Sequence, residues 1–127
     1  MTRLLLVEDN ELNRDMLSRR LTRAGFEVAV SCDGIHGIAA ARAHPPDWIV
    51  MDLSLPQMDG WTATRILKSD PAVGRIPVIA LTAHAMSGER EKALAAGCDA
   101  FETKPVDIAH LIGTINRLLK ERCPTPC

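Results

Sequence analysis

The chain has 127 residues, of which 46% are hydrophobic and 24% are charged, and its formal net charge at pH 7 is −1. This length and composition fit one soluble domain whose core folds without disulfides or a structural metal. The small net charge gives no general electrostatic reason to bind nucleic acid or an anionic membrane, and the apolar run at residues 4–7 is too short for a signal peptide or a membrane span, so we expect a cytosolic protein.

The N-terminal part of the chain predicts a strand followed by a helix. Residues 2–7 form a short apolar strand that runs into Glu8-Asp9. Asn10 is a good N-cap and Gly25 suits a left-handed position after a helix, so a helix is predicted between them. Its apolar residues recur at helical spacing: Leu12, Met16, Leu17 and Leu21.

The middle of the chain continues this alternation. Residues 26–30 alternate between apolar and polar side chains, as a strand does. Residues 34–44 are rich in alanine and are predicted to be helical as far as Pro45-Pro46. Residues 47–52 form an apolar strand that ends on a carboxylate, Asp52. We expect the following loop, shaped by Pro56, Asp59 and Gly60, to keep that carboxylate exposed.

The second half predicts a helix, strand, helix, strand and helix in turn. Residues 61–68 form a short helix, and residues 76–81 form a strand that tolerates Pro77 only near its start. A helix runs from Met86 or Ser87 to Gly97, and residues 99–103 form the last strand. Asp107 caps a final helix, whose apolar residues are Ile108, Leu111, Ile112, Ile115, Leu118 and Leu119.

Five strands alternating with five helices indicate an α/β fold in which helices cover both faces of a parallel sheet. Right-handed crossovers place every strand's carboxyl end at the same edge. Glu8, Asp9, Asp52, Thr82 and Lys104 all follow or end such strands, so we expect them to converge.

Convergence of three carboxylates indicates a cation between them, because like charges otherwise repel. Oxygen ligands with open positions suit Mg²⁺. A carboxylate paired with a metal can act as a nucleophile towards phosphorus, and Asp52 is our candidate. The Lys104 ammonium and the Thr82 hydroxyl would neutralise charge on the phosphoryl oxygens.

The motifs that carry these residues resemble the receiver domain of two-component response regulators. They are Val7-Glu8-Asp9-Asn10, Met51-Asp52-Leu-Ser-Leu-Pro56-Gln-Met-Asp59-Gly60, Ala80-Leu-Thr82-Ala83 and Lys104-Pro105. The resemblance covers residues 3–121, which implies one receiver domain over residues 1–122 and a short flexible tail at 123–127. It also implies a doubly wound, flavodoxin-like sheet with strand order 2-1-3-4-5.

The resemblance further assigns a role to each matching position. It implies that Asp52 is the phosphoacceptor, and that Mg²⁺ is held by Glu8, Asp9, Asp52 and the backbone carbonyl of Ser54. Lys104 would contact the phosphoryl group, Thr82 would be the switch hydroxyl, and Phe101 the aromatic switch partner. Because the last of these is a phenylalanine, no phenolic hydroxyl takes part. Ser54 and His84 occupy positions that tune phosphoryl lifetime in the family.

A receiver domain implies a sensor histidine kinase or a histidine phosphotransfer protein as the phosphodonor. Output would pass to a downstream protein through the face formed by the fourth helix, fifth strand and fifth helix, with no direct nucleic-acid or membrane contact. No effector domain follows in this sequence, so the chain is either a single-domain receiver or one domain of a longer hybrid kinase or regulator. The apolar last helix suits a homodimer interface or simply the core.

Other functions on this fold fit less well. An Asp-nucleophile phosphatase commonly has a second Asp two residues after the first, where this chain has Ser54. A flavodoxin-type cofactor site needs a phosphate-binding loop after the first strand, and Glu8-Asp9-Asn10 would repel phosphate. A receiver-like domain that takes no phosphate would not need all five key positions. We therefore expect a signalling phosphoacceptor that catalyses only its own phosphorylation and dephosphorylation.

The remaining chemically active side chains are expected to be structural or solvated. The four cysteines, Cys32, Cys98, Cys123 and Cys127, lack the spacing of a disulfide framework or a zinc motif, so we expect free thiols. The histidines on helices, His36, His44 and His110, are given no catalytic role. Trp48 and Trp61 are expected to pack in the core.

Overall fold

The computed structural model describes residues 2–53, 55, 58–82, 89–103 and 106–122. Within these ranges five strands alternate with five helices, as the sequence predicts, and most bounds agree to within two residues. The strands are β1 (Arg3–Val7), β2 (Glu27–Ser31), β3 (Trp48–Asp52), β4 (Val78–Thr82) and β5 (Ala100–Thr103). The helices are α1 (Glu11–Arg23), α2 (Gly34–Ala43), α3 (Gly60–Ser69), α4 (Glu89–Ala95) and α5 (Ile108–Arg122). The predicted start of the fourth helix and the tail at 123–127 lie outside the described residues.

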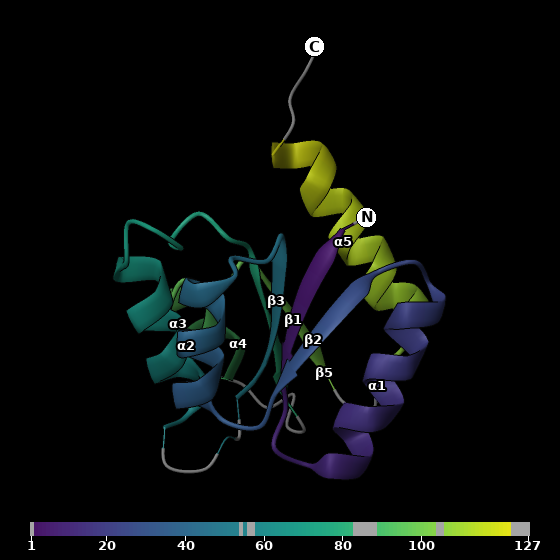
Figure 1. Ribbon diagram of the computed structural model, residues 1–127. Helices are drawn as coiled ribbons and strands as arrows, with labels where there is room; N and C mark the ends of the chain where they lie inside the picture. The colour runs from purple at the N-terminus through teal and green to yellow at the C-terminus, as the bar shows by residue number, and fades with distance from the viewer. Residues whose placement is uncertain (1, 54, 56–57, 83–88, 104–105, 123–127) are drawn as a thin grey trace.

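All strand pairs are parallel, and the sheet order is β2-β1-β3-β4-β5. Helices α1 and α5 cover one face, and α2, α3 and α4 cover the other (Figure 1). The predicted doubly wound fold and its strand order are therefore confirmed. Every strand ends at the lower edge in Figure 1, so residues that follow different strands meet there.

The core consists of two layers because alternate strand residues point to opposite faces of the sheet. In β1, Leu5 and Val7 join the layer under α2 and α3, whereas Leu4 and Leu6 join the layer under α1 and α5. Strands β3 and β4 divide in the same way and are fully buried. Burial on both faces explains why these strands read as continuous apolar runs.

The helix ends match the predicted capping signals. The Asn10 side chain accepts a hydrogen bond from the backbone N–H of Asn13 at 3.0 Å, and the Asp107 side chain accepts one from His110 at 3.2 Å. Gly25 has a φ of 104°, the left-handed conformation expected after a helix. The apolar face predicted for α1 is only half right, because Leu17 and Leu21 are buried while Leu12 is 81% and Met16 39% exposed.

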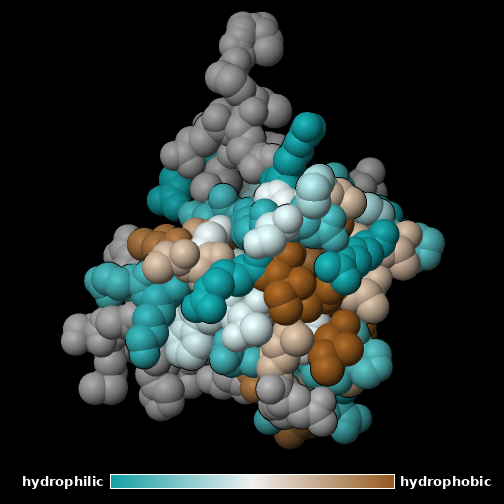
Figure 2. All heavy atoms as spheres, turned by 90° about the vertical axis from the view of Figure 1, so that its left-hand side faces the viewer, coloured by the Kyte–Doolittle hydropathy of each residue, from teal (hydrophilic) through white to brown (hydrophobic). Residues whose placement is uncertain are grey.

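The surface over α2, α3 and α4 is mainly hydrophilic, with separate hydrophobic groups rather than one continuous apolar face (Figure 2). Exposed large apolar residues of the described chain include Ile35 and Leu94. In the part of the chain that is described, no helix is both long and apolar enough to cross a bilayer. Cys32 and Cys98 are free thiols, as expected, whereas Cys123 and Cys127 lie outside the described residues.

Candidate functional site

Three carboxylates meet at the carboxyl edge of the sheet. Glu8 and Asp9 follow β1, and Asp52 is the last residue of β3, the neighbouring strand. One carboxylate oxygen from each of them lies within 4.8 Å of the other two. The convergence that the strand alternation predicts is therefore confirmed for these three residues.

The loop after β1 is held by backbone and guanidinium contacts. The backbone N–H of Glu8 donates to the carbonyl of Ser31 at 3.1 Å, which continues the β1–β2 ladder by one residue. The Arg14 guanidinium donates to the carbonyls of Glu8 at 3.0 Å and Asp9 at 3.4 Å. Arg14 was not predicted from the sequence, although an arginine in the first turn of the helix after an acidic pair was a usable signal.

Asp52 is buried, with 1% of its surface exposed, so the expectation that the following loop keeps it exposed is wrong. The chain turns back over it: Leu53 donates to the Leu81 carbonyl at 2.9 Å, and Gly60 donates to the Leu53 carbonyl at 3.2 Å. A Cβ at Gly60 would meet the Asp52 carbonyl oxygen and would lie 2.7 Å from the Leu53 Cα. Asp9 is the exposed member of the group, and Glu8 is fully buried.

Thr82 and Phe101 lie on the two strands beyond β3. Thr82 is buried at the end of β4 and is aligned with Thr103, while Phe101 on β5 is aligned with Ala80. Because side chains two residues apart share a face, Thr82 and Phe101 lie on the same side of the sheet. Phe101 is partly buried and packs against the core layer under α2 and α3. Lys104, Ser54 and His84 fall outside the described residues.

The donor atoms of this group suit a hard divalent cation. All three are carboxylate oxygens, two of them on buried residues, and like charges this close repel one another in a low-dielectric setting. A divalent cation would offset that repulsion, and Mg²⁺ prefers a few carboxylates while keeping some of its waters. The residues present therefore fit the metal that the sequence implies.

Comparison with known proteins gives a consistent result. A family model described as the response regulator receiver domain matches residues 4–116. The polar-differentiation response regulator DivK of Brucella anthropi is 39% identical over 115 residues, which are 91% of this chain and 94% of that protein.

Solved structures agree with this match. The receiver domain of the sensor histidine kinase PA1611 from Pseudomonas aeruginosa PAO1, solved with magnesium in its active-site cleft, is 38% identical with a TM-score of 0.85, over 91% of this chain and 95% of that one. The receiver domain of a signal transduction histidine kinase from Syntrophus aciditrophicus is 30% identical with a TM-score of 0.88, over 99% of this chain and 96% of that one.

Proposed function

The chain belongs to the response regulator receiver domain family, and from that premise we propose that Asp52 is its phosphoacceptor in a cytoplasmic two-component phosphorelay. The observation that carries this proposal is the group formed by Glu8, Asp9 and Asp52 at the carboxyl edge of the sheet. Two buried carboxylates and one exposed carboxylate, gathered from two strands, are costly for the fold and useful for binding a cation beside a nucleophile.

Magnesium is the cofactor we assign to this group. Glu8, Asp9 and Asp52 would hold it, together with the backbone carbonyl of Ser54, which remains an assignment from the sequence. When bound, the ion supplies positive charge that offsets the carboxylates and the phosphoryl oxygens. The magnesium in the Pseudomonas aeruginosa receiver domain supports this choice.

The chemical step is phosphoryl transfer to a carboxylate. A carboxylate oxygen of Asp52 forms a bond to phosphorus while the nitrogen–phosphorus bond of a phosphohistidine breaks, and the electron pair stays on the imidazole. The Thr82 hydroxyl and the Lys104 ammonium would contact the phosphoryl oxygens. Hydrolysis of the acyl phosphate by the same site would reverse the signal, and Ser54 and His84 would set its lifetime.

The switch we propose links Thr82 to Phe101. A phosphoryl group at Asp52 adds charge that the buried Thr82 hydroxyl can approach, which opens room for Phe101 on the same side of the sheet. The face formed by α4, β5 and α5 would then change and contact a downstream protein. The phosphodonor would be a sensor histidine kinase or a histidine phosphotransfer protein.

A small phosphodonor tests this assignment directly. The chain is incubated with acetyl phosphate and Mg²⁺, and its intact mass is measured. We expect a gain of one phosphoryl group that is lost at alkaline pH, and no gain in Asp52→Asn or when a chelator removes the metal.

Asp59→Asn is the matched control. Asp59 lies in the same loop but caps α3 by accepting the Thr62 N–H at 2.7 Å, a role that asparagine also fills. This variant should keep the adduct. An adduct that persists in Asp52→Asn, or none in the parent chain, would refute the assignment. Steady turnover of unrelated phosphoesters would favour a phosphatase.

A further inference from the structure

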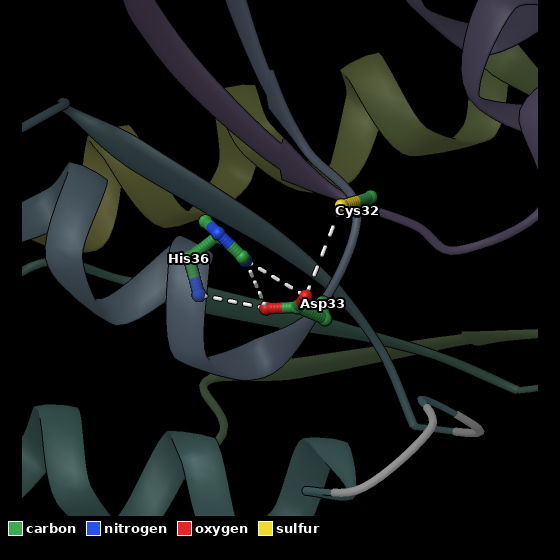
Figure 3. Close-up of side chains that lie close together, drawn as sticks. All are labelled: Cys32, Asp33 and His36. Atoms are coloured by element: carbon green, nitrogen blue, oxygen red, sulfur yellow. Dashed lines mark hydrogen bonds and ion pairs between the residues drawn. The ribbon is translucent and has the colours of Figure 1, made fainter.

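A second group of metal-ligating side chains lies where β2 passes into α2. Cys32, Asp33 and His36 each offer one ligand atom, and these atoms lie within 4.8 Å of one another. Figure 3 shows the Asp33 carboxylate between the Cys32 thiol and the His36 ring. The Cys32 Sγ is 3.8 Å from Asp33 Oδ2, and the His36 Nδ1 is 2.8 Å from both carboxylate oxygens.

The helix itself holds two of these ligands in place. Asp33 is the N-cap of α2, and its Oδ1 accepts the backbone N–H of His36 at 2.7 Å. That N–H, followed by the imidazole, lowers the pKa of the Asp33 carboxyl, which therefore stays ionised. Because one oxygen already makes the cap, the other can bind a ligand without loosening the helix start.

The donor atoms of Cys32, Asp33 and His36 are sulfur, oxygen and nitrogen, whereas those of the acidic group at Asp52 are all oxygen. A thiolate, an imidazole and a carboxylate suit zinc, which takes sulfur, nitrogen and oxygen ligands, whereas Mg²⁺ takes oxygen. At zinc bond lengths, tetrahedral neighbours lie about 3.3–3.6 Å apart. The observed separations of 2.8 Å and 3.8 Å fall on either side of that range, so small side-chain movements would complete the geometry.

The exposure of the group also gives a cation access to it. Cys32 is exposed and the His36 side chain is 71% exposed, so water can fill the remaining coordination position. A bound cation would replace the contact between His36 Nδ1 and the Asp33 carboxylate and would take the Cys32 sulfur as its thiolate.

We propose that Cys32, Asp33 and His36 form a surface site for a thiophilic divalent cation of the zinc class, separate from the oxygen-only group at Asp52. The site adjoins that group: Ser31, one residue before Cys32, accepts the backbone N–H of Glu8. Gly34, in the first turn of α2, lies against Met58 in the loop after β3, where an added Cβ would be 3.2 Å from the Met58 carbonyl. His36 has no role predicted from the sequence, and only the side-chain positions reveal the group.

Cobalt(II) is the probe that tests the site, because a thiolate ligand gives it an ultraviolet charge-transfer absorption. The titration uses the full chain with Cys123→Ser and Cys127→Ser, and excess Mg²⁺ to saturate the oxygen-only group. We expect one Co²⁺ per chain with the thiolate band, displaced by Zn²⁺. Cys32→Ser should abolish the band, and His36→Gln should weaken binding at least about tenfold.

Cys98→Ser and His44→Gln are the matched controls. Burial raises the pKa of the Cys98 thiol to about 11, so it should remain protonated, and both controls should bind Co²⁺ unchanged. Thermal unfolding of each variant shows whether the domain keeps its stability, and Asp33 with its cap of α2 is unchanged in all of them. A band that survives Cys32→Ser, unchanged affinity in His36→Gln, or no saturable binding would overturn the proposal.

Discussion

The two edges of the sheet place carboxylates in different surroundings. At the carboxyl edge, Glu8, Asp9 and Asp52 are placed against one another within 4.8 Å. At the amino edge, Asp47 accepts the backbone N–H of Arg3 at 2.8 Å, and Asp99 accepts from the Lys68 ammonium at 2.8 Å. The difference indicates that one edge is arranged for ligand chemistry and the other for stability.

The amino-edge pair around Lys68 ties three segments together. Besides Asp99, its ammonium donates to the Ile76 carbonyl at 3.0 Å, and the same Asp99 oxygen accepts the Val78 N–H at 2.9 Å. These contacts join the end of α3, the start of β4 and the loop before β5. The Lys68 and Asp99 side chains are only 20% and 31% exposed, so the pair is partly shielded from water.

The largest effect should come from crowding the carboxyl edge at Gly60. Gly60→Ala places a methyl group against the Asp52 carbonyl and the Leu53 Cα, and the backbone must move. We expect a loss of about 3 kcal/mol in unfolding free energy, measured by urea denaturation. Gly113→Ala is the control: a Cβ there meets nothing within 4 Å, so this helix position should gain about 0.5–1 kcal/mol. Equal effects would contradict the close approach.

A smaller effect is expected from breaking the amino-edge pair. Asp99→Ala leaves the Lys68 ammonium without its carboxylate and the Val78 N–H without its acceptor. Urea denaturation should show a loss of about 2 kcal/mol, with phosphorylation by acetyl phosphate unchanged. Asp15→Ala removes an exposed pair with Arg19 and should change stability by less than about 0.5 kcal/mol. Loss of phosphorylation in Asp99→Ala would contradict the assignment of the amino edge to stability alone.

Removing a charge at the carboxyl edge should raise the unfolding free energy, whereas removing Asp99 at the amino edge lowers it. Asp9→Asn relieves repulsion with Glu8 and Asp52, so without Mg²⁺ the chain should gain about 1 kcal/mol in unfolding free energy. The same variant should lose most of the extra stability that Mg²⁺ gives the parent chain, because a ligand is gone. Asp15→Asn makes the same charge change away from the site and should do neither. An Asp9→Asn variant that is destabilised and keeps the full Mg²⁺ response would show that Asp9 neither repels the other two carboxylates nor binds the metal.

The acidic group at the carboxyl edge could be predicted from the sequence, because the topology of a parallel sheet brings its strand ends together. Asp52 and Glu8-Asp9 follow parallel strands, so their meeting required no side-chain detail. Spacing was less reliable: Leu12 and Leu17 both fit a helical repeat, yet they lie roughly 140° apart around the axis and only Leu17 is buried. The close approach of Gly60 to the Asp52 carbonyl depends on the fold of a loop, which spacing cannot specify.

A buried carboxylate on β5 is paired with two side chains of α5. Glu102 on β5 is 7% exposed; it accepts the Thr114 hydroxyl at 3.0 Å and contacts the His110 Nδ1 at 2.7 Å. The hydrogen bond to Glu102, followed by its charge, raises the pKa of the His110 imidazole; Asp107 adds to this effect and Arg117 opposes it. The cation in this ion pair is therefore titratable.

The smallest predicted effect follows from that titration. His110 has a folded-state pKa above its ordinary value of about 6.5, so its stabilising contribution is complete below that value and is lost as the pH rises through the folded-state pKa. Replacing His110 with glutamine should therefore lower Tm more at about pH 6 than at about pH 9. In a Glu102→Gln background, where the carboxylate partner is gone, this difference should disappear. If the His110→Gln penalty is constant across this range, the Glu102 pair does not depend on the imidazolium, because a neutral hydrogen bond would then account for it.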